Sequence, residues 1–298
     1  MKFPNITTIP LLKYSTVLIP QVTILLMVTI AFKVFYDGSL FNGFTGNTGS
    51  IEYYLRRAIR RFVKDFTLSK ASRTDPGVSA VGNVVSIQFS DGHKLTPGML
   101  NSRLPHGLRV WAWAEVNDEF NAKIAVSRTY IYVMPWLYED VDLMKGAAEL
   151  FVGVHDLSNF QVKERGVPTT VMINGVNIER YGDYLVLIIT GRGFRNKMIR
   201  KIVNAIRMVG LGTLSIDELR DLIEFKVKRP VPPASPYGLL LLNVNYGNRE
   251  PNWLLCPGCL SYVVNYLGNR WYNSLPNLFV ILKILHEFMD INKLFSRI

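Results

Sequence analysis

The chain has 298 residues, a hydrophobic fraction of 49% and a net charge of +11, from 34 Lys and Arg against 23 Asp and Glu. This length and apolar content exclude a disordered protein and suffice for two domains of ordinary size with buried cores. The positive charge favours a polyanionic partner, either a nucleic acid or an acidic membrane surface, and charge alone does not choose between them.

The cysteine content is low. Cys256 and Cys259 are the only two. We therefore expect no disulfide framework, and we expect the protein to lie in a reducing compartment. Their C-x-x-C spacing is half of a zinc site, but the four histidines are scattered and none forms a ligand pair at helical spacing. We therefore interpret the pair as a Pro-Gly turn that carries two buried thiols, and we expect no metal.

The N-terminal region poses a membrane question. Residues 17–32 carry no charge and follow two lysines, as in a signal peptide or an anchor. The stretch contains a proline and is shorter than the ~20 apolar residues that a spanning helix requires. Residues 28–35 also alternate as a strand does. We predict an N-terminal extension over 1–26, a folded unit that begins near Met27, and no membrane attachment; a membrane-associated protein is the weaker alternative.

Strand-like and helix-like segments alternate through the first half of the chain. Residues 51–66 predict an amphipathic helix with a continuous apolar stripe. Its other side carries the first basic cluster, which consists of Arg56, Arg57, Arg60 and Arg61. Further strands are predicted at residues 85–89, 110–116 and 129–134.

A second half begins where the pattern changes, near residues 135–142. Strands are predicted at 169–178, 184–190 and 239–244, and helices at 194–209 and 215–225; the second helix opens with a Ser-x-Asp-Glu start. Because both halves mix strands and helices in the same way, we predict an α+β fold with two comparable domains, 27–136 and 137–246. Residues 247–298 are predicted to be an apolar appendix, helical over 278–295, packed on the body or on another subunit.

The segment Thr74-Asp75-Pro76-Gly77 has the composition of a tight turn. A carboxylate at the tip of such a turn is suited to act as a nucleophile or a general base. It needs a cationic partner to stay ionised inside a closed site. The second basic cluster offers one, and it consists of Arg195, Lys197, Arg200 and Lys201. On charge pattern alone, a solvated helix face is the simpler interpretation of that cluster.

Several separate stretches resemble the TruA family of tRNA pseudouridine synthases, in that family's order. The resemblance runs from about Met27 to Tyr246. It rests on Tyr36-Asp37-Gly38-Ser39, Arg73-Thr74-Asp75-Pro76-Gly77-Val78, Arg128-Thr129-Tyr130, Gly153-Val154-His155-Asp156-Leu157, Phe194-x-x-x-Met198-Ile199-Arg200 and Ala234-Ser235-Pro236-Tyr237-Gly238-Leu239.

The resemblance implies a fold and a reaction. The fold would be two similar ferredoxin-like or RRM-like α+β halves, with a largely antiparallel sheet and a central catalytic cleft. The reaction would isomerise uridine to pseudouridine in the anticodon stem-loop of tRNA, at a position of the 38/39/40 type, without a cofactor or a metal. A cytoplasmic homodimer is implied as well.

The resemblance also assigns roles. Asp75 would be the nucleophile and Arg200 its paired cation. Tyr130 would stack on the flipped uracil and is a candidate for removing the C5 proton. Arg73 would fill the gap left by the extruded base, for which a planar cation is suited. The residues expected to bind the RNA backbone, besides Arg73, are Arg56, Arg57, Arg60, Arg61, Arg195, Lys197 and Lys201.

Among the departures from the family pattern, two lie close to Asp75. Ser72 stands where the family usually has glycine, and a serine does not cheaply take the positive φ that glycine allows. Pro76 restricts the backbone of Asp75 before it. These departures motivate an alternative, a tRNA-binding protein of the same fold with weak or no catalysis.

Overall fold

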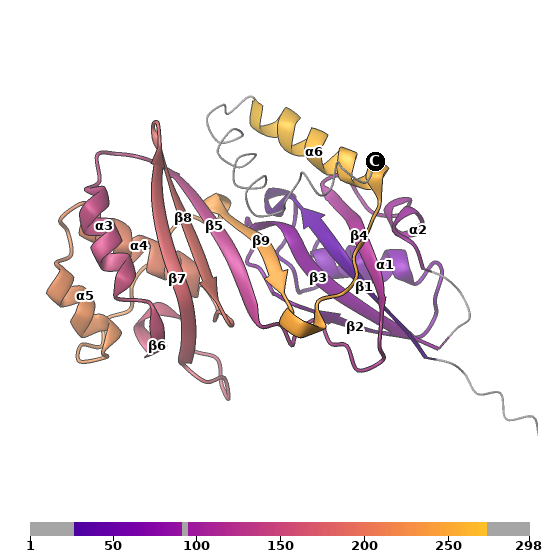
Figure 1. Ribbon diagram of the computed structural model, residues 1–298, viewed down its shortest axis with the longest axis horizontal. Coiled ribbons are helices and arrows are strands. Elements are labelled where there is room, and N and C mark those ends of the chain that lie inside the picture. The colour runs from indigo at the N-terminus through magenta and orange to yellow at the C-terminus, as the bar shows by residue number, and fades with distance from the viewer. Residues whose placement is uncertain (1–26, 91–94, 273–298) are drawn as a thin grey trace, which may run out of the picture.

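The computed structural model of the protein describes residues 27–90 and 95–272 (Figure 1). The predicted extension over 1–26 and the predicted helix over 278–295 lie outside these residues. Within them, one sheet runs through the whole molecule in the strand order β10-β4-β1-β3-β9-β5-β8-β7-β6, with β2 paired beside β3.

The strands are β1 (Val28–Tyr36), β2 (Phe66–Lys70), β3 (Ser79–Phe89), β4 (Leu108–Val116), β5 (Ser127–Pro135), β6 (Gly153–Asp156), β7 (Thr170–Tyr181), β8 (Tyr184–Gly191), β9 (Leu239–Asn245) and β10 (Leu254–Leu255). The α-helices are α1 (Ile51–Ile59), α2 (Pro97–Asn101), α3 (Val141–Glu149), α4 (Met198–Gly210), α5 (Ile216–Ile223) and α6 (Pro257–Tyr272). Short 3-10 helices are η1 (Gly38–Leu40), η2 (Ser158–Phe160), η3 (Pro236–Gly238) and η4 (Gly247–Arg249).

The pairing of β3 with β9 joins the two halves of the sheet. It is parallel and brief, with Ser79 opposite Leu240 and Ala80 opposite Leu241. The other pairings between the described strands are antiparallel. This mixed α+β architecture with a mostly antiparallel sheet agrees with the predicted fold class, whereas the likeness of each half to a ferredoxin stays a prediction.

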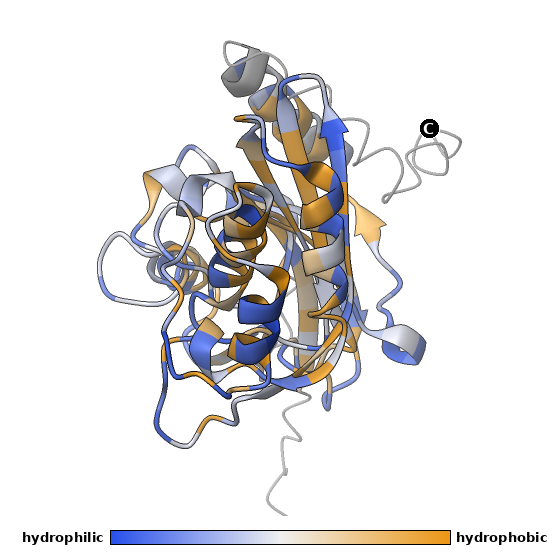
Figure 2. Cartoon of the chain, turned by 90° about the vertical axis from the view of Figure 1, so that its left-hand side faces the viewer, coloured by the Kyte–Doolittle hydropathy of each residue, from blue (hydrophilic) through white to orange (hydrophobic). Residues whose placement is uncertain are grey.

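Successive side chains of a strand point to opposite faces, and this alternation separates two apolar layers. On one face, Tyr36 and Ala80 pack in the core that the helices α1 to α5 share. On the other face, Phe35 and Val81 pack under α6, which contributes Tyr266 among others. Figure 2 views the molecule from the side of α3, α4 and α5 and shows helices that carry both hydrophilic and hydrophobic segments beside the strands. Helices α1 to α5 therefore cover one face of the sheet, and α6 covers part of the other face, over the N-terminal side, while the outer face of β7 is exposed.

The strands predicted from alternation are all present, as β1, β3, β4, β5, β7, β8 and β9. The helix predicted at 215–225 is also present as α5, and its Ser215 and Glu218 form a capping box at its start. No helix among the described residues is long and apolar enough to cross a membrane.

Three local predictions were wrong. The helix predicted over 51–66 ends at Ile59, and Phe66 instead begins β2, opposite Phe89. An edge strand that buries few side chains leaves a pattern too weak to separate from the end of a helix. Phe194 lies before α4, not in it. Cys256 and Cys259 are half-buried and joined by a disulfide at the start of α6, so they are not two buried thiols.

The predicted domain boundary after residue 136 does not divide the sheet. β5 belongs to the first domain by sequence but pairs with β8 and β9 on the C-terminal side. Conversely, β10 and α6 of the predicted appendix return to the N-terminal side, where β10 pairs with β4 and α6 packs against it (Figure 1). The chain therefore crosses the centre of the sheet more than once, and the loops that hold the site meet there.

Candidate active site

Asp75 lies in the loop that joins β2 to β3, with its side chain 25% exposed. Its Oδ2 accepts a hydrogen bond from Nη1 of Arg200 at 2.7 Å, and the Arg200 side chain is 12% exposed. The structure therefore places a cation beside this carboxylate, which is what an ionised carboxylate in a confined site requires. The two residues are 125 positions apart in sequence.

Arg200 is held from two sides. It lies in the first turn of α4, and its Nε donates to the carbonyl of Ala234 at 2.7 Å. The backbone N–H of Ala234 donates in turn to the carbonyl of Arg200 at 2.9 Å. The segment that precedes η3 thus fixes the direction of the guanidinium, and Nη1 is left to face Asp75.

The end of β1 and the turn that follows it support the Asp75 loop. The hydroxyl of Tyr36 hydrogen-bonds that of Thr74 at 2.9 Å, and both side chains are buried. Nδ2 of Asn83 donates to the Tyr36 hydroxyl and to the Ser72 carbonyl, each at 3.1 Å. A Cβ at Gly38 would lie 2.1 Å from the Val78 carbonyl oxygen, so only glycine fits there. The Tyr-Asp-Gly-Ser motif therefore packs against the Asp75 loop and holds its backbone in place.

Tyr130 on β5 faces the same loop. It is 6% exposed, and its hydroxyl donates to Oγ of Ser72 at 3.0 Å. The edge of its ring meets Phe194, with 5.5 Å between the ring centroids. Burial raises the pKa of the Tyr130 phenol, the Ser72 hydrogen bond and the positive charge of Arg128 partly oppose this, and the negative charge of Asp75 adds a smaller increase. Since the ordinary value is already 10.0, the phenol is neutral near pH 7.

Ser72 causes no backbone strain. It is absent from the described residues that have a positive φ, so its conformation does not require glycine. The side chain also supplies an oxygen that glycine lacks, and that oxygen is the partner of Tyr130. The departure at this position is therefore accommodated by the site.

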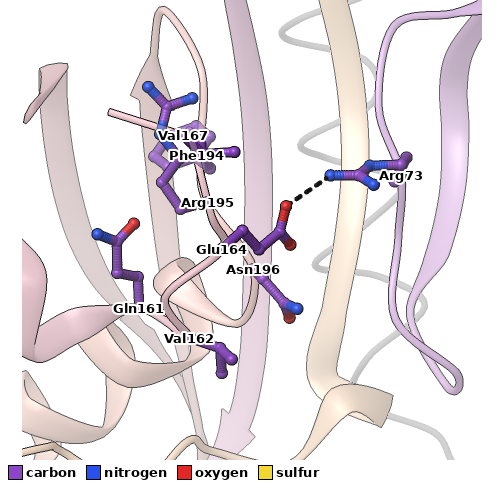
Figure 3. A pocket seen from close by; sticks show the side chains of 8 residues that line it. All are labelled: Arg73, Gln161, Val162, Glu164, Val167, Phe194, Arg195 and Asn196. Atoms are coloured by element: carbon purple, nitrogen blue, oxygen red, sulfur yellow. Dashed lines mark hydrogen bonds and ion pairs between the residues drawn. The ribbon is translucent and has the colours of Figure 1, made fainter. Parts of the chain in front are cut away.

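Arg73 lies on the outer side of the loop, with 63% of its side chain exposed. Its Nη2 pairs with Oε2 of Glu164 at 3.2 Å, and this ion pair lies at a small pocket (Figure 3). The pocket is lined by Arg73, Gln161, Val162, Glu164, Val167, Phe194, Arg195 and Asn196. It lies between the Asp75 loop and the loops of the C-terminal half, the region where a central cleft is predicted.

The two basic clusters differ in their surroundings. In the first, Arg57, Arg60 and Arg61 are exposed, whereas Arg56 pairs with Glu52 at 2.9 Å. The second cluster has an exposed Lys197 and a half-buried Arg195, whose Nε donates to the Pro168 carbonyl at 2.7 Å.

Lys201 does not fit its predicted place on the RNA-binding surface. Its side chain is buried, and its Nζ donates to the carbonyl oxygens of Asn159 at 3.4 Å and Gln161 at 3.1 Å. Burial lowers the pKa of Lys201, and the nearby Lys197 lowers it further. The sequence pattern put this lysine at the edge of the cluster, but the helix turns it toward the inside.

Arg128 belongs to a motif quoted from the sequence, but the motif assigned it no role; the structure makes it a positioning residue. It is 7% exposed, and its guanidinium donates to the carbonyls of Ala71, before the Asp75 loop, and of Arg192, before Phe194. It thereby ties loops of the two halves together. Its place two residues before Tyr130 on the same strand face was the available signal. Among the described residues, no three of His, Cys, Asp or Glu gather as metal ligands would.

The site as described has an arginine-paired carboxylate, a buried neutral tyrosine and one largely exposed arginine, Arg73, at its edge. A family model described as tRNA pseudouridine synthase matches residues 147–247. A protein of Pyrobaculum neutrophilum named tRNA pseudouridine synthase A is 47% identical over 218 residues, which cover 72% of this chain and 82% of the relative. Its counterpart from Archaeoglobus fulgidus, of the same name, is 38% identical over 75% of this chain and 86% of the relative.

The chain belongs to the TruA family of tRNA pseudouridine synthases, and it is an isomerase by that membership. A solved structure titled "Crystal Structure of a Cbf5-Nop10-Gar1 Complex" aligns with a TM-score of 0.36 and 10% identity, over 72% of this chain and 48% of that one. A likeness of this size supports no inference about this protein.

Proposed function

We propose that this protein converts uridine to pseudouridine in the anticodon stem-loop of tRNA, with Asp75 as the nucleophile. The observation that carries the proposal is the 2.7 Å ion pair between Asp75 and Arg200. It sets a guanidinium against a carboxylate at the tip of a loop while a quarter of that side chain is open to a substrate. Membership of the family supplies the reaction class.

The chemistry follows from these positions. The Asp75 carboxylate attacks the target nucleoside, and the bond between uracil N1 and the ribose breaks. The freed uracil rotates and rejoins the ribose through C5. The C5 proton is lost, N1 gains a proton, and Asp75 is released. No atom is added or removed, so the reaction needs no redox group or hydrolytic water.

Tyr130 contacts the extruded base, and Arg73 occupies the gap that the base leaves. A buried, neutral phenol ring offers a flat apolar surface on which uracil stacks, and its raised pKa argues against a phenolate base at pH 7. Arg73 is planar, charged and exposed, so it is suited to occupy the gap that the flipped nucleotide leaves in the RNA stack. The pair with Glu164 holds its side chain at the edge of the pocket before RNA arrives.

The tRNA backbone would follow the exposed cations. Arg57, Arg60 and Arg61 at the end of α1 and Lys197 at the start of α4 are the members with free charge among the described residues. Arg56 and Arg195 keep other partners but remain within reach of solvent. The 38/39/40 position, a homodimer and a cytoplasmic location follow from the family resemblance, and mapping of pseudouridine and sedimentation of the purified protein test the first two.

The experiment is the variant Asp75→Asn, which keeps the size of the side chain and removes the nucleophilic charge. We expect it to fold, to bind an unmodified tRNA transcript as the wild type does, and to release no tritium from transcript labelled at uridine C5. Isomerisation by Asp75→Asn at the wild-type rate would exclude Asp75 as the nucleophile.

The rival is a tRNA-binding protein with weak or no catalysis. Pro76 motivates it, whereas Ser72 no longer does, since its backbone is unstrained and its hydroxyl serves Tyr130. Wild-type protein that binds the transcript tightly and forms no pseudouridine would establish the rival.

A further inference from the structure

Gln161 is a buried amide whose side chain has no hydrogen-bonding partner among the residues that the structure describes. It follows η2, and 7% of its surface is exposed. Within the described ranges, only its backbone carbonyl accepts a hydrogen bond, from Lys201. Buried side-chain amides in native proteins are nearly always hydrogen-bonded, because the desolvation of unpaired polar atoms is unfavourable. Such a group therefore needs an explanation.

Asn159, two residues earlier, shows the ordinary case. It is 5% exposed, and its Nδ2 donates to the carbonyls of Leu222 at 2.9 Å and Val227 at 2.7 Å. Its Oδ1 accepts from the backbone N–H of Arg229 at 3.1 Å. The same short segment thus carries one amide whose hydrogen bonds fasten the fold and one whose polar atoms meet no partner in the described part of the chain.

The Gln161 side chain lines the pocket beside the Asp75 loop. In Figure 3, Gln161 and Arg195 lie on one side of this pocket, and Arg73 reaches from the other side to Glu164. Neither Asp75 nor Tyr130 lines it, so it is separate from the place proposed for the target uracil. It adjoins that place, because Phe194 lines the pocket and its ring contacts Tyr130.

We propose that this pocket is a subsite for a second nucleotide of the tRNA, one that flanks the target uridine, and that Gln161 reads its base. The proposal rests on the proposed function, since it names how the same RNA is selected. A carboxamide presents a donor and an acceptor side by side, which matches the paired acceptor and donor on the edge of a base.

The charges around the pocket fit an RNA ligand. Arg73 and Arg195 frame the amide with two guanidinium groups, and phosphates lie on either side of every nucleotide in a strand. Entry of the nucleotide displaces the ion pair between Arg73 and Glu164. The Arg73 side chain is 63% exposed and that of Glu164 33%, so solvent screens the pair and its loss costs little.

Lys201 gives the amide its position. Its buried ammonium donates to the backbone carbonyls on either side of Phe160, which fixes the segment from Asn159 to Gln161 against α4. Lys201, which the sequence pattern placed on the RNA-binding surface, is therefore buried behind that surface. It holds the backbone of Gln161, the residue that we assign to base recognition.

The test is Gln161→Leu, with Asn159→Leu as the matched control. Both changes replace a buried amide by an apolar side chain of similar size. Because the Gln161 amide makes no hydrogen bond with the described residues, we expect Gln161→Leu to melt at or above the wild-type temperature, whereas Asn159→Leu melts well below it. On a tRNA transcript labelled at uridine C5, Gln161→Leu should lose about tenfold or more in kcat/KM, mostly through KM.

A second measurement isolates the reading of the base. Transcripts that differ by one base at the nucleotides flanking the modified uridine are assayed with wild type and with Gln161→Leu. The wild type should prefer some bases over others, and the variant should lose that preference. Wild-type kcat/KM in Gln161→Leu, a melting temperature lowered as in Asn159→Leu, or an unchanged base preference would each overturn the proposal. Absence of activity in the wild type would instead contradict the proposed function.

Discussion

The two basic clusters look alike in the sequence, yet the fold uses them in different ways. The first, at the end of α1, keeps three exposed arginines with no protein partner among the described residues. The second, at the start of α4, has members engaged by other residues: Arg200 with Asp75, Lys201 with two buried carbonyls and Arg195 with a third. Composition thus predicts the amount of positive charge in a segment, while packing decides whether that charge faces solvent, the Asp75 carboxylate or the interior.

The largest expected effect comes from the cation of the site. Arg200→Met should lower kcat by roughly 10²–10³-fold, because it leaves the Asp75 carboxylate without its charged partner and unfastens the Ala234 segment. The affinity for tRNA should change little. Single-turnover rates and filter binding measure the two quantities separately.

Arg207→Met is the matched control on the same helix. Arg207 pairs with the buried Glu139 at 2.9 Å, away from Asp75. This variant should lose stability and keep its single-turnover rate. Equal losses of rate in both variants would show that Arg200 acts through the helix and not through the carboxylate.

A smaller effect is expected from Lys201. Lys201→Met should lower the free energy of unfolding by about 1–3 kcal/mol, since it leaves two buried carbonyls without their donor. Unfolding in urea measures this loss. Unchanged stability together with weaker tRNA binding would instead show that Lys201 contacts RNA. The two clusters would then not differ in this way.

The smallest effect belongs to the first cluster. Replacing Arg57 and Arg60 by alanine should weaken tRNA binding modestly and leave stability and kcat unchanged. The slope of log affinity against log salt should become shallower by about 0.7 to 0.9 for each phosphate that the variant no longer neutralises. Filter binding over a range of KCl concentrations measures this, with Arg220→Ala on α5 as the control. A slope that is the same in both variants would place the RNA elsewhere.

Much of the fold was predictable from the sequence because strands with buried faces leave a strong apolar pattern. β1 and β8 are of this kind, since they are buried along most of their length. β2 was not predictable, because its pairing with β3 depends on a partner that local periodicity does not identify. The parallel pairing of β3 with β9 lies beyond any local pattern, and so does the return of the chain after Tyr246 to the N-terminal side.

The site shows the same limit. The resemblance named Asp75, Tyr130 and Arg200, and the demand for a cation beside the carboxylate followed from electrostatics. The direction of a side chain within a cluster did not follow, which is why Lys201 was misplaced. The roles of Ser72 and Gln161 depend on which atoms lie near their polar groups, and only the assembled structure shows this.

The position of β9 has a consequence for how the protein folds during its synthesis. Among the described strands only β10 follows it in the chain, yet it lies between β3 and β5 at the middle of the sheet. Until it emerges, the strands on its two sides have nothing to join them, and the Ala234 segment that holds Arg200 is not yet in place. A nascent chain that ends before β9 contains Asp75 without this framework. Because the closure joins strands that are far apart in the sequence, we expect it to be a slow stage of folding.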